Sequence, residues 1–221
     1  MSGLRERNKE RRRQAILDAA IELLRSNDIQ AVTTEQIAAR AEVSPPTIYN
    51  LVGTREQLLL ALLDRISEQI ANWFSPPEGE VDDPIGLARR AIDETVAIFV
   101  ADSAAYRQVV RALGDLAVSA SKLSFDPQHF HVSAIRRAQE LEILRDDLDA
   151  VALGRQSLLG YFAALNSWAT GGLDDEGFGV AAHHGMTTVL AAASSDEHRE
   201  RHIAELAALG GTLARVTWNQ R

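Results

Sequence analysis

The chain has 221 residues, of which 46% are hydrophobic and 24% charged, and its 23 Lys and Arg against 31 Asp and Glu give a formal net charge of −8. This composition is typical of a globular protein, so an extensively disordered or fibrous chain is excluded. The sequence contains no cysteine, which excludes disulfides, thiolate metal sites, cysteine nucleophiles and thiol-based redox sensing.

The first residues are charged where a signal peptide would be apolar. The most apolar run, residues 58–63, is far shorter than the roughly 20 residues that a membrane-spanning helix needs. We therefore expect a cytoplasmic protein with no membrane partner.

The charge is distributed unevenly along the chain. Residues 1–13 contain six basic and two acidic side chains, residues 1–55 have a net charge of +2, and residues 56–221 have a net charge of −10. A basic head on an acidic body indicates that one end binds a polyanion. A solvated, solubilising tail explains the same pattern and stays open as the alternative.

Helical spacing of apolar residues recurs throughout the chain, whereas alternating strand patterns and Asn-Gly or Asp-Gly turns are missing. We therefore expect an all-α fold of about nine helices. In chain order, the first predicted helix ends at about residue 26. The later ones span about 34–41, 45–52, 54–70, 84–100, 103–118, 127–144, 147–168, 174–193 and 196–218, and a linker is predicted at 75–80.

Residues 33–58 carry the most informative pattern. Thr33 and Gln36 have the spacing of a capping box before a short helix, and Ser44 followed by two prolines predicts the start of another. Two short helices joined by the turn 42–44 form a helix-turn-helix, whose second helix normally lies in the major groove of DNA. A helical hairpin inside an all-α core is the alternative.

The outer face of this segment is polar. Its side chains are short hydrogen-bonding groups and one phenol, types that contact phosphate oxygens or base edges. They are Thr34, Ser44, Thr47, Tyr49 and Asn50. Arg55 begins the next helix, where we expect it to add a phosphate contact beside the helix N-terminus.

Four blocks of sequence, residues 13–20, 33–38, 43–49 and 55–58, resemble in order and spacing the N-terminal domain of TetR/AcrR-family transcriptional regulators. The resemblance implies two domains. Residues 1–55 would form an N-terminal arm and a three-helix helix-turn-helix DNA-binding domain, and residues 56–221 a larger helical ligand-binding and dimerisation domain. Glu42 stands where the family usually has glycine, and a positive φ at this residue would cost about 1 kcal/mol.

The resemblance also implies roles for individual residues of the head. Thr34, Thr47 and Tyr49 would bind phosphates, and Arg55 would take the place of a family lysine that does the same. Pro45, Pro46 and Asn50 would face bases, the prolines through thymine methyl groups and the amide through adenine. Residues that would reach phosphates or the minor groove from the arm are Arg11, Arg12 and Arg13. The base sequence that is read does not carry over, because several recognition-helix residues depart from the family.

For the body, the resemblance implies a homodimer built on helices 147–169 and 174–193, and an effector pocket. Glycine and alanine along 177–193 would allow close approach of a partner helix, although tight packing within the chain explains them equally well. A homodimer would present two recognition helices about 34 Å apart to a palindromic operator. Candidate pocket residues, for each of which plain core packing is the alternative, are Phe99, Tyr106, Phe125, Phe130, Tyr161, Phe162, Asn166 and Trp168.

No pattern in the sequence indicates catalysis, a cofactor or a metal site. His129 and His131 do not have the i, i+4 spacing of helical ligands, and His183 and His184 point about 100° apart on a helix. No nucleophile elbow, phosphate-binding loop or dinucleotide-binding motif is present. We do not expect an enzyme.

The sequence thus predicts a DNA-binding transcriptional regulator that represses as a homodimer and is released by a small-molecule effector. One alternative is an adaptor of the same fold that recruits a protein partner and has no effector. Another is a helical enzyme or carrier in which the helix-turn-helix is incidental.

Overall fold

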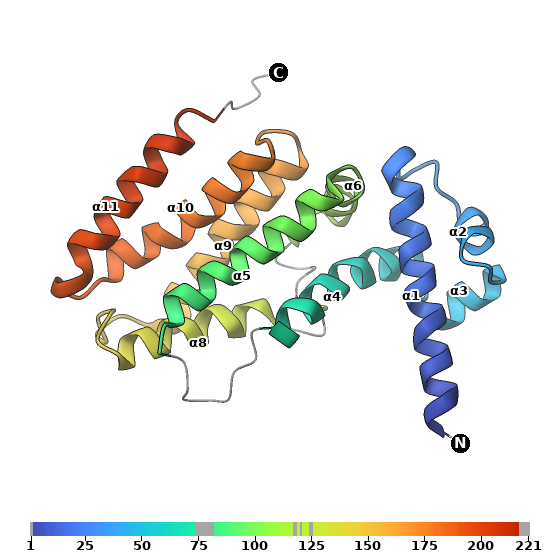
Figure 1. The fold of residues 1–221 in the computed structure, drawn as a ribbon, viewed down its shortest axis with the longest axis horizontal. Coiled ribbons are helices and arrows are strands. Elements are labelled where there is room, and N and C mark those ends of the chain that lie inside the picture. The colour runs from blue at the N-terminus through green and yellow to red at the C-terminus, as the bar shows by residue number, and fades with distance from the viewer. Residues whose placement is uncertain (1, 74–81, 117–118, 120, 124–125, 217–221) are drawn as a thin grey trace.

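A computed structural model describes residues 2–73, 82–116, 119, 121–123 and 126–216. This part of the chain contains ten helices and no strand, which confirms the all-α prediction (Figure 1). The helices, labelled as in Figure 1, are α1 (Ser2–Ser26), α2 (Thr34–Arg40), α3 (Pro45–Leu51), α4 (Arg55–Trp73), α5 (Pro84–Ala101), α6 (Ser103–Leu113), α8 (Pro127–Glu140), α9 (Ala150–Ala169), α10 (Asp175–Ala193) and α11 (Asp196–Leu213). None of the described helices is long and apolar enough to cross a membrane.

Helices α1–α3 form a head at one side of the molecule, and α4 runs from this head to the body made of α5–α11 (Figure 1). The head closes around Ile16, Ile37, Ala38 and Ile48, all of which are buried. The predicted capping box of Thr33 and Gln36 is present, and Thr54 and Gln57 form a second one, so α2 and α4 begin directly after Thr33 and Thr54. In the first box, the Gln36 amide donates to the Thr33 hydroxyl oxygen at 3.2 Å.

The predicted N-terminal arm is helical in the structure, because α1 begins at Ser2. Residues 4–13 are mostly Arg, Lys and Glu, which are good helix formers. The Glu10 carboxylate lies 3.7 Å from the Arg13 guanidinium and accepts a hydrogen bond from the Gln14 side-chain amide at 2.7 Å. These two contacts stabilise the helix around residues 10–14. The N-terminal half of α1 consequently projects past α3 as a helix (Figure 1).

The body packs around an aromatic cluster. The Trp168 ring stacks on Phe178 with centroids 5.2 Å apart and meets the edge of Phe99 at 6.0 Å. The Arg107 guanidinium lies 4.4 Å from the Trp168 ring centroid and donates to Asp175 at 2.8 Å. Because α5, α6, α9 and α10 each contribute to this cluster, it holds these four helices together.

The small residues of α9 and α10 pack these two helices together within the chain. A Cβ placed on Gly160 would lie 3.2 Å from the Cα of Gly185, so the two backbones approach as closely as glycine permits. On α9, a Cβ on Gly154 would lie 2.8 Å from the Val132 backbone of α8. Gly185, which we assigned to a dimer interface or to intrachain packing, therefore has an intrachain role, and the dimer stays a prediction.

Three predicted helix ends differ from the structure, and one of them is that of α11, which ends at Leu213 instead of at about residue 218. Helix α6 ends at Leu113, before Gly114 with φ of 68°. Helix α8 ends at Glu140, because the following turn places Glu142 at φ of 57° and pairs Leu144 with Ser194 in an isolated bridge. The predicted linker at 75–80 lies outside the described residues.

Candidate functional site

The outer face of α3 is exposed and carries most of the predicted DNA contacts. Tyr49 is 59% exposed, although it is a large aromatic side chain. Ser44, Pro46 and Asn50 are exposed as well, whereas Pro45 and Thr47 are half-buried. The structure thus brings the predicted contacts of α3 together on one accessible surface, which we call the α3 face.

The turn before α3 sets the orientation of this face. Glu42 adopts a φ of 54°, the left-handed conformation that the comparison with glycine anticipated. The Val43 amide then donates to the Ala38 carbonyl at 2.9 Å and closes the turn. Ser44 precedes α3 as expected but makes no side-chain capping bond; its hydroxyl pairs instead with Thr47 at 2.8 Å.

Thr34 is half-buried at the start of α2, and Arg55 lies at the start of α4. The Arg55 guanidinium donates to the Val32 carbonyl at 2.8 Å and also to the Ile29 carbonyl. It therefore fixes the α1–α2 connection against α4. The phosphate contact of Arg55 stays a prediction. Nothing in the local sequence indicates its hydrogen bonds to the Val32 and Ile29 carbonyls.

Basic side chains line the projecting part of α1. Arg11 and Arg12 are exposed, and Arg13 is half-buried beside Glu10. Arg5, Lys9 and Arg12 are exposed and share the helical spacing of the buried Ile16. This basic stripe therefore continues the buried side of α1 into the part of the helix that projects beyond the head.

The head also contacts the body through α6, which sequence reasoning missed. The Gln108 carboxamide accepts from the Ile29 amide at 2.6 Å and donates to the Leu24 carbonyl at 2.9 Å. Beside it, Arg25 of α1 pairs with Asp102 at 2.5 Å. These contacts join the end of α1 directly to the body, so α4 is not the sole connection between the two parts.

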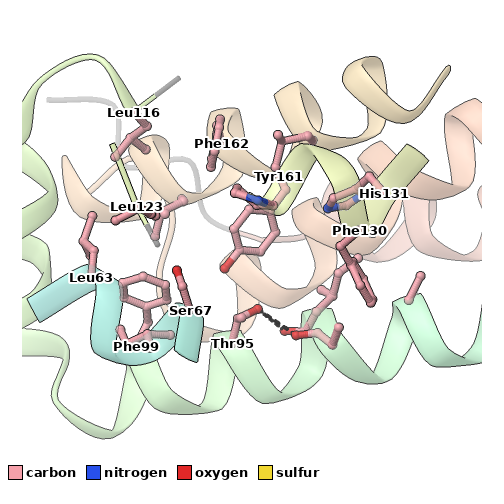
Figure 2. Close-up of a pocket in the computed structure, with 17 residues that line it drawn as sticks. Leu63, Ser67, Thr95, Phe99, Leu116, Leu123, Phe130, His131, Tyr161 and Phe162 are labelled. Atoms are coloured by element: carbon pink, nitrogen blue, oxygen red, sulfur yellow. Dashed lines mark hydrogen bonds between the residues drawn. The ribbon is translucent and has the colours of Figure 1, made fainter. Parts of the chain in front are cut away.

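The body contains an apolar cavity of about 110 Å³ between α4, α5, α8 and α9 (Figure 2). Aromatic rings from three of these helices line it, namely Phe99, Phe130, Tyr161 and Phe162. Aliphatic side chains, among them Leu63 and Ile66 of α4, complete most of the wall. A ligand in this cavity would touch α4, the helix that leads to the head.

Few polar groups reach the cavity. In Figure 2 the Tyr161 hydroxyl points toward Ser67 and Thr95. Among the described residues this hydroxyl makes no hydrogen bond; the neighbouring Thr95 hydroxyl donates to the Ala91 carbonyl at 2.9 Å. Burial raises the pKa of Tyr161, so its phenol keeps its proton.

His131 forms a second polar position in the wall. Its Nδ1 lies 3.1 Å from the Ser157 hydroxyl. Burial lowers the pKa of His131 to about 4, so the imidazole is neutral at physiological pH. Sequence reasoning weighed His131 only as a metal ligand, although its i, i+4 relation to the buried Ile135 marks it as an inward residue.

The predicted pocket residues divide into two groups. Phe99, Phe130, Tyr161 and Phe162 meet in the cavity. Three others do not line it: Tyr106 is buried against Phe99, Trp168 belongs to the aromatic cluster, and Asn166 is exposed on α9. Phe125 lies outside the described residues.

Residues 16–62 match the family described as bacterial regulatory proteins, tetR family. Among curated proteins, the class D tetracycline repressor protein of Escherichia coli is 34% identical over 68 residues, which are 31% of this chain and 31% of that protein. The chain thus aligns with about a third of the length of the curated relatives it matches.

Solved structures resemble the chain over most of its length. SmeT, the repressor of the Stenotrophomonas maltophilia multidrug efflux pump SmeDEF, is 21% identical with a TM-score of 0.64, covering 83% of this chain and 91% of that one. FadR of Thermus thermophilus, a TetR-family transcriptional repressor solved with lauroyl-CoA, is 21% identical with a TM-score of 0.59, covering 81% and 93%. At this identity the likeness shows a shared fold.

Proposed function

The chain belongs to the TetR family of transcriptional regulators, and on this premise we propose that it is a cytoplasmic repressor whose operator affinity is lowered by a small-molecule effector. Members of this family are transcription factors rather than enzymes. The observation that carries the proposal is the exposed α3 face, placed at one end of a body that contains an apolar cavity.

The α3 face and the basic stripe of α1 supply the chemistry for DNA. The Tyr49 and Thr47 hydroxyls suit phosphates, and the Asn50 amide suits an adenine edge. Residues 56–221 have a net charge of −10, so the body repels DNA and restricts contact to the head.

A homodimer would give two α3 faces for two half-sites of a palindrome, about 34 Å apart. We place its interface on the outer faces of α9 and α10. In such a dimer the partner would cover Leu159 of α9, an apolar side chain that is 44% exposed in the single chain.

Effector binding in the cavity would shift the population of dimer conformations. A ligand against Leu63 and Ile66 bears on α4, while Gln108 couples the body to the α1–α2 connection. The ligand would favour a conformation in which the two α3 faces no longer match the spacing of the half-sites. A dimer in that conformation releases the operator. The alternative of an adaptor without an effector predicts a closed, fully packed body, and the cavity favours the effector hypothesis.

Selection of genomic DNA fragments by the purified protein tests the DNA-binding part of this proposal. We expect a palindromic sequence to be enriched, and footprinting to show two protected half-sites separated by one helical turn. Retention of fragments without any shared sequence would overturn the proposal.

Replacing Tyr49 with phenylalanine should weaken binding to operator and to unrelated DNA by the same factor, about tenfold for each α3 face. The hydroxyl is expected to donate to a phosphate, which carries no sequence information. Fluorescence anisotropy with both duplexes at one salt concentration measures the two affinities. Tyr106→Phe, which removes a hydroxyl from the buried core, is the matched control. A loss confined to the operator would contradict the phosphate role.

A further inference from the structure

We propose that the cavity binds a small uncharged phenol, whose hydroxyl pairs with the unpartnered hydroxyl of Tyr161. This inference rests on the proposed function, because it names the chemical class of the effector that the same cavity would take. Three properties of the cavity lead to it: its size and aromatic wall, its lack of charge, and the position of one buried hydroxyl.

The size and wall of the cavity suit a single aromatic ring. The cavity measures about 110 Å³, and an apolar cavity of about 150 Å³ in another protein binds benzene. Phe99, Phe130 and Phe162 offer ring faces and edges from three different helices. Aromatic rings pack against one another with favourable edge and stacked geometries, so a ring fits this wall better than a branched aliphatic group of equal volume.

The wall excludes a charged ligand. Among the described residues that line the cavity, none is Asp, Glu, Lys or Arg. His131 lies in the wall as a neutral imidazole, since burial lowers its pKa to about 4. A carboxylate or an ammonium group would therefore enter an apolar space without a counter-charge, at a large desolvation cost.

The polar groups of the cavity specify a hydroxyl on the ligand. The Tyr161 hydroxyl is fully buried and has no hydrogen-bond partner among the described residues. The neighbouring Thr95 hydroxyl gives its proton to the Ala91 and Ile92 carbonyls, so it can only accept. A ligand hydroxyl, which both donates and accepts, would bond Tyr161 and still have a proton for Thr95. A bare hydrocarbon would leave the buried Tyr161 hydroxyl unsatisfied.

Calorimetric titration of the purified full-length protein with phenol, toluene and benzoate tests the proposal. These probes share a ring and differ in the substituent. We expect phenol to bind most tightly, toluene to bind more weakly and benzoate not to bind. Tyr161→Phe should weaken phenol binding about three- to tenfold, the range for one neutral hydrogen bond, and leave toluene binding within about twofold. Tyr106→Phe, which alters a buried tyrosine outside the cavity, should change neither.

The proposal would be overturned if benzoate or toluene bound as tightly as phenol. It would also be overturned if phenol did not bind. An equal loss of phenol and toluene binding in Tyr161→Phe would also overturn it, because that pattern indicates a structural role of Tyr161. Release of DNA is measured separately by adding phenol to the protein–operator complex. If phenol binds as expected but does not release the DNA, the proposed ligand class is still supported. That result would contradict only the effector function.

Discussion

Replacing Trp168 with alanine is expected to lower the free energy of unfolding by about 3–5 kcal/mol. The side chain is fully buried, and it contacts Phe178, Phe99 and Arg107 from three other helices. The indole N–H also donates to Asp175 at 2.7 Å. Removing the indole therefore creates a cavity at the centre of the body and leaves the Arg107 guanidinium without its aromatic contact.

Equilibrium unfolding in urea, followed by circular dichroism, measures this effect. Ile203→Ala serves as the control, because Ile203 is an apolar side chain of α11 that is 51% exposed and lies outside the interface proposed on α9 and α10; we expect it to cost less than about 1 kcal/mol. A loss below about 1 kcal/mol for Trp168→Ala would contradict the central place of this residue in the body.

Acidification is expected to destabilise the protein through His131. The pKa of this imidazole is lowered by burial from 6.5 to about 4. As the pH falls below 6.5, the unfolded chain binds a proton that the folded chain does not bind. The contribution of His131 to the free energy of unfolding is thus fully present above pH 6.5. It decreases as the pH falls to about 4, by about 3 kcal/mol in all. Burial lowers the pKa of His202 too, with Arg201 and Arg89 adding to the effect, and this histidine acts in the same direction.

The contribution of His131 is isolated with His131→Gln, which retains a hydrogen-bonding side chain beside Ser157 and does not titrate. The free energy of unfolding, measured in urea at pH 7 and at pH 4.5, should fall less between these two pH values in this variant than in the wild type. His129→Gln, an exposed position on the same helix, is the control and should behave as the wild type. Identical acid losses in His131→Gln and the wild type would refute the assignment.

Local sequence patterns predicted the head in detail. Capping boxes depend on residues three positions apart, so the local sequence is enough to locate the start of α2. The positive φ of Glu42 was suggested by the family resemblance, because the family usually has glycine at this position. What these patterns missed in the head is the bonding of Arg55, whose partners lie 23 and 26 residues away along the chain.

The body was predicted less completely, because its site is assembled from distant segments. Aromatic residues are visible in the sequence, but whether a ring lines a cavity or fills the core depends on neighbours from other helices. Phe99 and Tyr106 illustrate this, since their rings touch at 5.3 Å and yet only Phe99 lines the cavity. Ser67 and Thr95 were not considered, as a small hydroxyl on a helix carries no local sign that it faces a cavity. Gln108 was missed for the same reason, since its bonds reach the head across more than 75 residues.

The most direct test of the central claim, that the α3 face binds one DNA sequence specifically, is an anisotropy titration with two duplexes. One is the palindrome recovered from the selected fragments, and the other has the same length and composition in scrambled order. At physiological salt we expect the palindrome to bind at least about a thousandfold more tightly, with two protomers per duplex. Equal affinity for both duplexes over a range of salt concentrations would contradict the claim, because phosphate contacts alone would then account for all the binding.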